Sequence, residues 1–136
     1  MSFELDSRLE ADTVALGDMP LSRLRLMNDA RFPWLILVPR RPALREIFDL
    51  TATERGLLME EIAAVSAALR ETTGAEKLNI GALGNRVPQL HIHVVARFAA
   101  DVAWPSPVWG HGAAQAYAPA AARALAARLE ARLGFV

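Results

Sequence analysis

The order of hydrophobic and polar residues predicts several short strands in the first hundred residues. Leucine and arginine alternate over residues 21–26, and residues 13–18 form a similar segment before a proline-containing break, which predicts a hairpin. Residues 34–38 are all apolar, as expected for a central strand that is buried on both faces. Residues 77–81 form a further short segment, which we expect to pair antiparallel with the strand that follows it.

Two longer segments have the periodicity of helices. The first begins at Thr51, which forms a capping-box pattern with Glu54, and is expected to stop at Gly74. Its apolar stripe consists of Leu58, Ile62, Val65 and Leu69. We interpret its acidic pair, Glu60-Glu61, as a solvated face. The second helix is predicted over residues 118–133, where leucine recurs every four residues near the end.

These elements together predict an α+β fold in which residues 1–136 form a single domain. An antiparallel sheet of about five strands would be covered by the long helix and by the C-terminal helix. A chain of 136 residues is long enough to bury a hydrophobic core of its own.

Composition narrows the classes of function. The fifteen basic and fifteen acidic side chains cancel and no basic cluster occurs, which argues against nucleic acid as a partner. The absence of cysteine excludes disulfides, thiolate metal sites and a cysteine nucleophile. No signal segment and no apolar run of membrane-spanning length is present, so we expect no membrane partner and a cytoplasmic location.

The candidate chemistry lies between residues 87 and 95, where polar and apolar residues alternate. In a strand, this order places Gln89, His91 and His93 on one face, with the Cα atoms of the two histidines about 6.6 Å apart. The preceding residues 81–86 contain glycine and a cation, and such turns can direct backbone N–H groups at a phosphate. Exposed polar positions on an amphipathic strand would give the same alternation. The neighbouring turn favours a small-anion site.

Imidazole is suited to attack on phosphorus. It is largely unprotonated near neutral pH, so it can attack directly, and it departs well once protonated. Hydrolysis through a covalent intermediate on His91 would replace one difficult displacement with two easier ones. His93, Gln89 and the turn at residues 84–86 would then stabilise the charge that develops on the phosphoryl oxygens.

The segment over residues 84–95 resembles the signature of the histidine triad (HIT) superfamily of nucleotide hydrolases and transferases. That signature is His-x-His-x-His followed by two apolar residues, and it is preceded by a Gly-Gln-Ser/Thr-like turn. The resemblance covers approximately residues 12–110, because the strand that ends in Val38-Pro39 and the long helix occur in the order of the family. It implies a HIT-like fold and an active site that binds a nucleotide.

The resemblance also implies a role for each residue of the motif. His91 matches the middle histidine, the nucleophile that forms a nucleotidyl-histidine intermediate, and His93 matches the last, which orients it and the phosphate. Gln89 stands where the first histidine belongs; its amide can donate and accept hydrogen bonds but cannot carry a proton near neutral pH. Asn85 and Arg86 replace a glutamine and a small hydroxyl residue. The predicted phosphate-binding residues are Asn79, Gly84, Asn85 and Arg86.

Three further polar residues are candidates by position. Asn79 is expected near His91, where its amide could hold a phosphate oxygen or make an ordinary structural hydrogen bond. Asn28 lies in the loop that, by the resemblance, faces the ribose, and it could equally be a turn former. His111 could reach the site as a third histidine or lie free on the surface.

Three functions from different classes remain open. The first is a hydrolase or nucleotidyl transferase, without a cofactor, that cleaves a phosphoanhydride or phosphoramidate of an adenosine-type nucleotide, such as a dinucleoside polyphosphate. The second is a nucleotide-binding module that has lost turnover through Gln89. The third, least favoured in the absence of cysteine, is a metal site at the histidines. Trp104 and Trp109 lie on a stiff proline-rich segment, so their side chains need burial, either within the monomer or against a partner. In the family that the sequence resembles, this segment packs near the active site, often around a dimer two-fold axis, so we also expect a homodimer.

Overall fold

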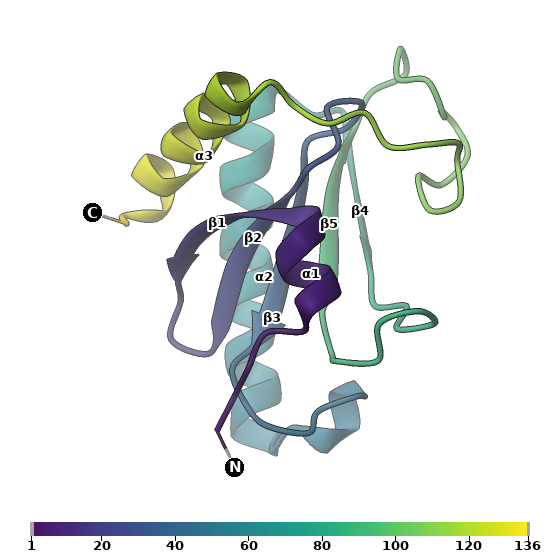
Figure 1. Cartoon of the computed structure of the whole chain (residues 1–136). Coiled ribbons are helices and arrows are strands. Elements are labelled where there is room, and N and C mark those ends of the chain that lie inside the picture. The colour runs from purple at the N-terminus through teal and green to yellow at the C-terminus, as the bar shows by residue number, and fades with distance from the viewer. Residues whose placement is uncertain (1, 136) are drawn as a thin grey trace.

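The computed structural model describes residues 2–135 and contains one five-stranded antiparallel sheet flanked by helices (Figure 1). The strands are β1 (Thr13–Asp18), β2 (Ser22–Met27), β3 (Trp34–Pro39), β4 (Lys77–Gly81) and β5 (Ile92–Arg97). The helices are α1 (Ser7–Asp12), α2 (Ala52–Thr73) and α3 (Pro119–Leu133), with a short 3-10 turn, η1 (Ile47–Asp49), before α2. The predicted α+β architecture is confirmed. No helix within residues 2–135 is long and apolar enough to cross a membrane.

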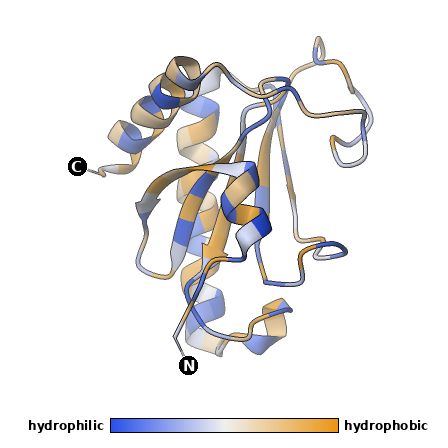
Figure 2. Ribbon diagram, in the orientation of Figure 1, coloured by the Kyte–Doolittle hydropathy of each residue, from blue (hydrophilic) through white to orange (hydrophobic). Residues whose placement is uncertain are grey.

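The strands follow one another in the sheet in the order β1-β2-β3-β5-β4. β3 is central and all six of its residues are buried, as its continuous apolar sequence predicts. Figure 2 shows hydrophobic residues along β3 and β5 in the middle of the sheet and a mixture along β2. The first three strands in the chain therefore join the last two at the β3–β5 pair, and both of these strands are buried throughout.

Alternate residues of β3 belong to two separate hydrophobic clusters. Leu35 and Leu37 join a cluster that includes the apolar stripe of α2, whereas Trp34, Ile36 and Val38 join a smaller cluster with α1 and the segment after β5. In Figure 1, α2 lies behind the sheet and α1 in front of it. The front face, which α1 covers only in part, is the face that carries the candidate site.

The ends of α2 follow the sequence signals. The Thr51 hydroxyl accepts a hydrogen bond from the N–H of Glu54 at 3.2 Å, and the Glu54 carboxylate accepts one from the N–H of Thr51 at 2.8 Å. The helix ends at Gly74, whose φ of 73° is left-handed. The capping box and the C-terminal stop are both confirmed.

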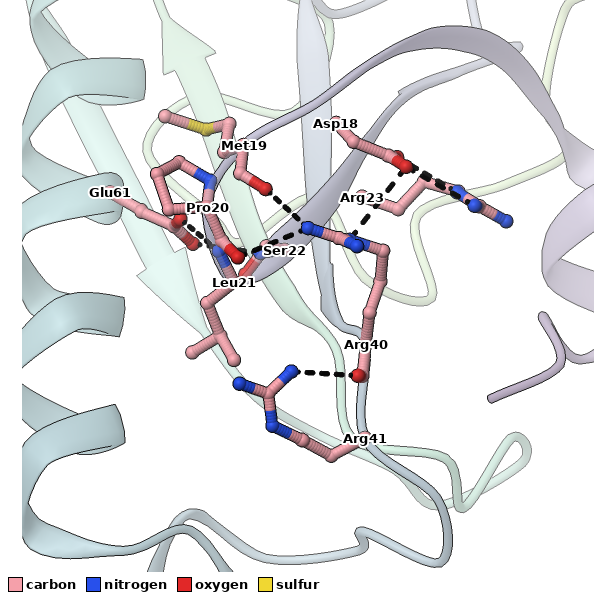
Figure 3. A network of polar contacts seen from close by, with 9 residues as sticks. All are labelled: Asp18, Met19, Pro20, Leu21, Ser22, Arg23, Arg40, Arg41 and Glu61. Atoms are coloured by element: carbon pink, nitrogen blue, oxygen red, sulfur yellow. Dashed lines mark hydrogen bonds and ion pairs between the residues drawn. The ribbon is translucent and has the colours of Figure 1, made fainter. Parts of the chain in front are cut away.

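One residue of α2 contradicts the sequence interpretation. Glu61 is buried, and its carboxylate accepts the backbone N–H groups of Leu21 at 2.7 Å and Ser22 at 3.0 Å (Figure 3). The prediction that Glu60-Glu61 faces solvent was therefore wrong for Glu61. The reason is its position three residues after Leu58, which places it on the buried face of the helix. Glu61 anchors the turn between β1 and β2 to α2.

Candidate active site

His91 and His93 lie where β5 begins, on the face of the sheet opposite to α2. His93 pairs with Ile36 of β3 on one side and with Gly81 of β4 on the other. Both histidines are 6 % exposed, and the centroids of their rings are 4.8 Å apart. The two imidazoles therefore form one buried unit in the middle of the sheet, as the spacing predicts.

The regular strand begins at Ile92, so the predicted strand over residues 87–95 was wrong for its first five residues. β4 ends at Gly81, whose partner is His93, and this leaves residues 87–91 without a strand to pair with. Pro88 also has no N–H to donate to a sheet. In residues 87–91, the alternation of polar and apolar residues therefore does not correspond to the two faces of a sheet.

One nitrogen of His91 is fixed by the backbone. Its Nδ1 lies 2.6 Å from the carbonyl oxygen of Gln89. A carbonyl only accepts hydrogen bonds, so Nδ1 must carry the proton, and Nε2 is left with an unprotonated lone pair. This is the tautomer that a nucleophilic imidazole requires, and it depends on the main chain of Gln89, not on its side chain.

His93 is fixed in the opposite tautomer. The indole Nε1 of Trp34 donates a hydrogen bond to Nδ1 of His93 over 3.0 Å. An indole N–H only donates, so Nδ1 is the acceptor and the proton is on Nε2. The ring is enclosed by Trp34 and Trp109, with centroid distances of 5.7 Å and 5.5 Å. Burial first, and the neighbouring His91 second, lower the pKa of His93 from 6.5 to about 3.

A cavity of about 540 Å³ opens beside the two histidines. It is bounded by α1, the end of β2, the turn after β4 and the segment that carries Trp109. Its lining residues are Leu9, Asp12, Met27, Trp34, Leu83, Gly84, Asn85, Arg86, Val87, His91, His93, Trp109, Gly110 and Gly112. A second hollow of about 190 Å³, which includes Arg45, Glu46 and Phe48, adjoins His91 from the side of η1. His91 thus lies between two spaces.

The structure brings the predicted turn residues to this cavity. Gly84, Asn85 and Arg86 all line it, next to both histidines. Gly84 has a φ of 75°, which residues with a Cβ rarely adopt. The Arg86 carbonyl accepts a hydrogen bond from the Arg8 guanidinium at 2.8 Å, so α1 holds the turn in place.

Three other predicted residues lie elsewhere. Asn79 does not line the cavity; its amide oxygen accepts a hydrogen bond from the Arg97 guanidinium at 2.7 Å, which is the structural role considered as its alternative. The side-chain oxygen of Asn28 accepts the N–H of Tyr117 at 2.9 Å, and Asn28 lines an adjoining hollow of about 360 Å³. His111 is exposed and lines none of these spaces.

The alternation predicted that the side chain of Gln89 would share one face with the two histidines. The structure contradicts this, because the Gln89 amide points to the N-terminal segment. Its oxygen accepts the N–H of Asp6 at 2.9 Å and its nitrogen donates to the carbonyl of Glu4 at 2.8 Å. Because both ends of the amide are occupied, this side chain fixes the N-terminal segment beside the site.

Sequence reasoning missed one residue of the site, Trp34, and one residue that supports it from outside the cavity, Arg97. Trp34 was interpreted only as part of a buried strand, although the register that pairs Ile36 with His93 places Trp34 on the same face. Arg97 was not singled out, yet it is almost fully buried and holds the segment after β5. Its guanidinium donates to Asp101 at 2.8 Å and to the carbonyl of Ser106 at 2.8 Å. A charged residue inside an apolar strand was the available signal.

Within residues 2–135, no group of three or more His, Asp or Glu side chains is arranged to hold a metal ion. The Nδ1 atoms of His91 and His93 are both engaged by protein groups. The geometry instead presents one bare imidazole nitrogen, one imidazole N–H and a glycine-containing turn to a single cavity, which suits attack on a bound phosphoryl group.

A family model and several solved structures of known proteins all match the same family. The HIT domain family matches residues 8–100. A histidine triad protein of Bradyrhizobium japonicum is 47% identical, with a TM-score of 0.96 over 98% of this chain and 99% of the other. A histidine triad protein of Sinorhizobium meliloti is 50% identical, with a TM-score of 0.94 over 96% of each chain. One from Marinobacter aquaeolei is 42% identical, with a TM-score of 0.95 over 98% of each.

The search of curated proteins gave no match. The domain match covers more than half of the chain, and the solved structures are similar over nearly all of it. The chain therefore belongs to the histidine triad (HIT) family.

Proposed function

We propose that this protein is a nucleotide hydrolase or nucleotidyl transferase in which His91 attacks the phosphorus atom. Its substrate is a phosphoanhydride or phosphoramidate of an adenosine-type nucleotide, such as a dinucleoside polyphosphate. The observation that carries the proposal is the 2.6 Å contact between Nδ1 of His91 and the Gln89 carbonyl, which leaves the Nε2 lone pair for the phosphorus. Family membership supports the same class of reaction.

Gln89 takes the first position of the triad in this proposal. Its contribution to His91 is the backbone carbonyl, which any residue at this position would supply. Loss of the histidine side chain here is therefore compatible with turnover. The Gln89 amide is committed to the N-terminal segment and has no part in the chemistry.

The remaining residues bind and orient the nucleotide. The Nε2–H of His93 and the turn of Gly84, Asn85 and Arg86 stabilise the negative phosphoryl oxygens. The ribose lies toward Asn28, whose hollow shares Met27 and Trp34 with the main cavity. Asn79 is not part of the proposed set, because its amide oxygen is used by Arg97.

The direct test is intact-protein mass spectrometry after brief mixing with adenosine phosphoanhydrides and phosphoramidates. A nucleotide-sized adduct, or a released mononucleotide, is expected from the wild type with at least one of these compounds and should disappear in His91→Ala. His111→Ala is the matched control, because this histidine is exposed and outside the cavity. If no adduct or product forms although nucleotides bind, the protein is a nucleotide-binding module instead.

We also propose that two copies of the chain form a homodimer and that the protein is located in the cytoplasm. Trp104 is 39 % exposed and Val102 is 65 % exposed on the segment after β5, so this segment presents apolar surface. Light scattering coupled to gel filtration should give twice the mass of one chain. A monomer at micromolar concentration would remove this part of the proposal.

A further inference from the structure

The surroundings of His93 restrict what the site can do with a proton. Nδ1 of this residue already accepts the indole N–H of Trp34 over 3.0 Å. The only proton of the ring is on Nε2. A second proton would have to go on Nδ1, where it would face the indole N–H of Trp34, which is also a donor. The ring is also packed between the two tryptophans. His93 is therefore a fixed hydrogen-bond donor and not an acid that gives up and regains a proton.

The other groups near the histidines do not supply such an acid. Gln89 is an amide, and both of its polar atoms bond to the N-terminal segment. The carboxyl groups of Asp12 and Glu46 are exposed to solvent and are not held against either histidine. Arg86 and Arg45 line the two hollows as permanent cations. His111 is exposed and lines neither hollow.

We propose, on the basis of the proposed function, that this protein cleaves only nucleotides whose leaving group departs without receiving a proton. The substrate class is then phosphoric anhydrides and other adenylyl compounds with an acidic leaving oxygen, and it excludes phosphoramidates of ordinary amines. Trp34 is the positioning residue for this selectivity, since it acts through His93.

The covalent step balances without an acid. The Nε2 lone pair of His91 forms the bond to phosphorus, and the bond from phosphorus to the leaving oxygen breaks with both electrons on that oxygen. The leaving group departs as an anion that the protein does not protonate. His91 keeps its Nδ1 proton on the Gln89 carbonyl and becomes a nucleotidyl-imidazolium. Water then attacks the phosphorus, the electron pair returns to Nε2, and the proton of the water passes to solvent.

An amine leaving group cannot follow this path. The nitrogen would depart as a strongly basic amide anion unless it gained a proton while its bond to phosphorus breaks. A phosphate leaving group, by contrast, has a second pKa of about 6, so it is stable as an anion at neutral pH. A hydrogen bond from His93 is therefore sufficient for the departure of a phosphate and insufficient for the departure of an amine.

Leaving-group kinetics test this proposal in the full-length wild-type protein. The probes are adenosine 5′-(4-nitrophenyl phosphate), adenosine 5′-(phenyl phosphate) and an alkyl phosphoramidate of adenosine monophosphate. We expect the nitrophenyl ester to react at least ~100-fold faster than the phenyl ester, because charge builds up on the leaving oxygen in a loose transition state. The phosphoramidate should give no adduct above the His91→Ala background.

The outcomes separate this inference from the proposed function. If the phosphoramidate reacts within tenfold of the nitrophenyl ester, this inference is overturned while the proposed function stands. If neither the three probes nor a dinucleoside polyphosphate gives an adduct or a product, the proposed function itself fails.

A second readout does not depend on turnover. Nitrogen-15 NMR of the wild type should show His93 protonated at Nε2 from pH 8 down to pH 5, with Nδ1 unprotonated throughout. Trp34→Phe removes the indole donor that faces Nδ1 of His93, so this nitrogen becomes free to take a proton, and phosphoramidate cleavage should appear. Trp104→Phe, a tryptophan outside the cavity, should change neither. A wild-type His93 that takes up a second proton above pH 6 would overturn the inference even if the Trp34 variant does not fold.

Discussion

The side-chain oxygen of Gln89 accepts a hydrogen bond from the backbone N–H of Asp6 over 2.9 Å. The amide nitrogen of the same side chain donates to the carbonyl of Glu4, so the residue ties the segment before α1 to the segment before β5. Phe3 and Leu5 of that segment pack against the apolar cluster on the front of the sheet. Gln89 thus has a structural function of its own, which is to hold the N-terminal segment.

Gln89→Ala should loosen the N-terminal segment while the sheet stays intact. The amide of Asp6 should exchange with deuterium about fivefold faster, since one such hydrogen bond contributes about 1 kcal/mol. Hydrogen-exchange mass spectrometry of residues 3–8 measures this change. Gln115→Ala is the control, because that glutamine is exposed. Unchanged exchange in the Gln89 variant would show that the packing of Phe3 and Leu5 alone holds the segment.

His93 should make the stability of the protein depend on pH. A histidine in the unfolded chain takes up a proton near pH 6.5, whereas burial lowers the pKa of His93 in the folded chain to about 3. Between these values the unfolded state binds one more proton, so the free energy of unfolding falls as the pH falls. The loss from pH 7.5 to pH 5 should be about 2 kcal/mol.

Urea unfolding at these two pH values measures the effect. His93→Gln keeps an acceptor for Trp34 but cannot titrate, so the difference between pH 7.5 and pH 5 should shrink by the same ~2 kcal/mol. Carboxylates with lowered pKa values, such as Asp101, contribute mainly below this range. An equal pH dependence in the wild type and in the variant would mean that His93 takes up its proton in the folded state.

Most of the fold could be predicted from the sequence because its signals are local. The apolar run of β3, the capping box at Thr51 and Glu54 and the stop at Gly74 each depend on a few neighbouring residues. The burial of Glu61 was missed, because a carboxylate beside a leucine stripe usually faces water. The backbone donors that satisfy it belong to Leu21 and Ser22, which are distant in the sequence.

The candidate site could be predicted only in part, because its decisive contacts join distant parts of the chain. The motif gave the positions of His91 and His93 and the turn that lines their cavity. The bond from Trp34 to His93 spans 59 residues and that from Gln89 to Asp6 spans 83. Neither follows from periodicity, since it depends on how strands and loops meet in three dimensions.

The buried ion pair of Arg97 and Asp101 should be essential for stability. The Arg97 guanidinium holds the pKa of Asp101 at about 2, and both side chains are at most 5 % exposed. Asp101→Asn should lower the free energy of unfolding by ~3 to 5 kcal/mol, because it leaves a buried charge unpaired. Glu71→Gln breaks the exposed pair with Arg132 and should cost less than ~1 kcal/mol. Equal losses in the two variants would contradict this assignment.

Glu61 should matter for the turn between β1 and β2, to which its carboxylate is bonded in Figure 3. Glu61→Gln replaces one acceptor oxygen with an NH₂ group that faces a backbone N–H, so a buried donor loses its partner. The expected loss in the free energy of unfolding is ~1 to 3 kcal/mol, measured by urea denaturation. Glu60→Gln makes the same chemical change on the exposed neighbour and should alter stability by less than ~0.5 kcal/mol. If both variants unfold at the same urea concentration, the turn does not depend on Glu61 for its hydrogen bonds.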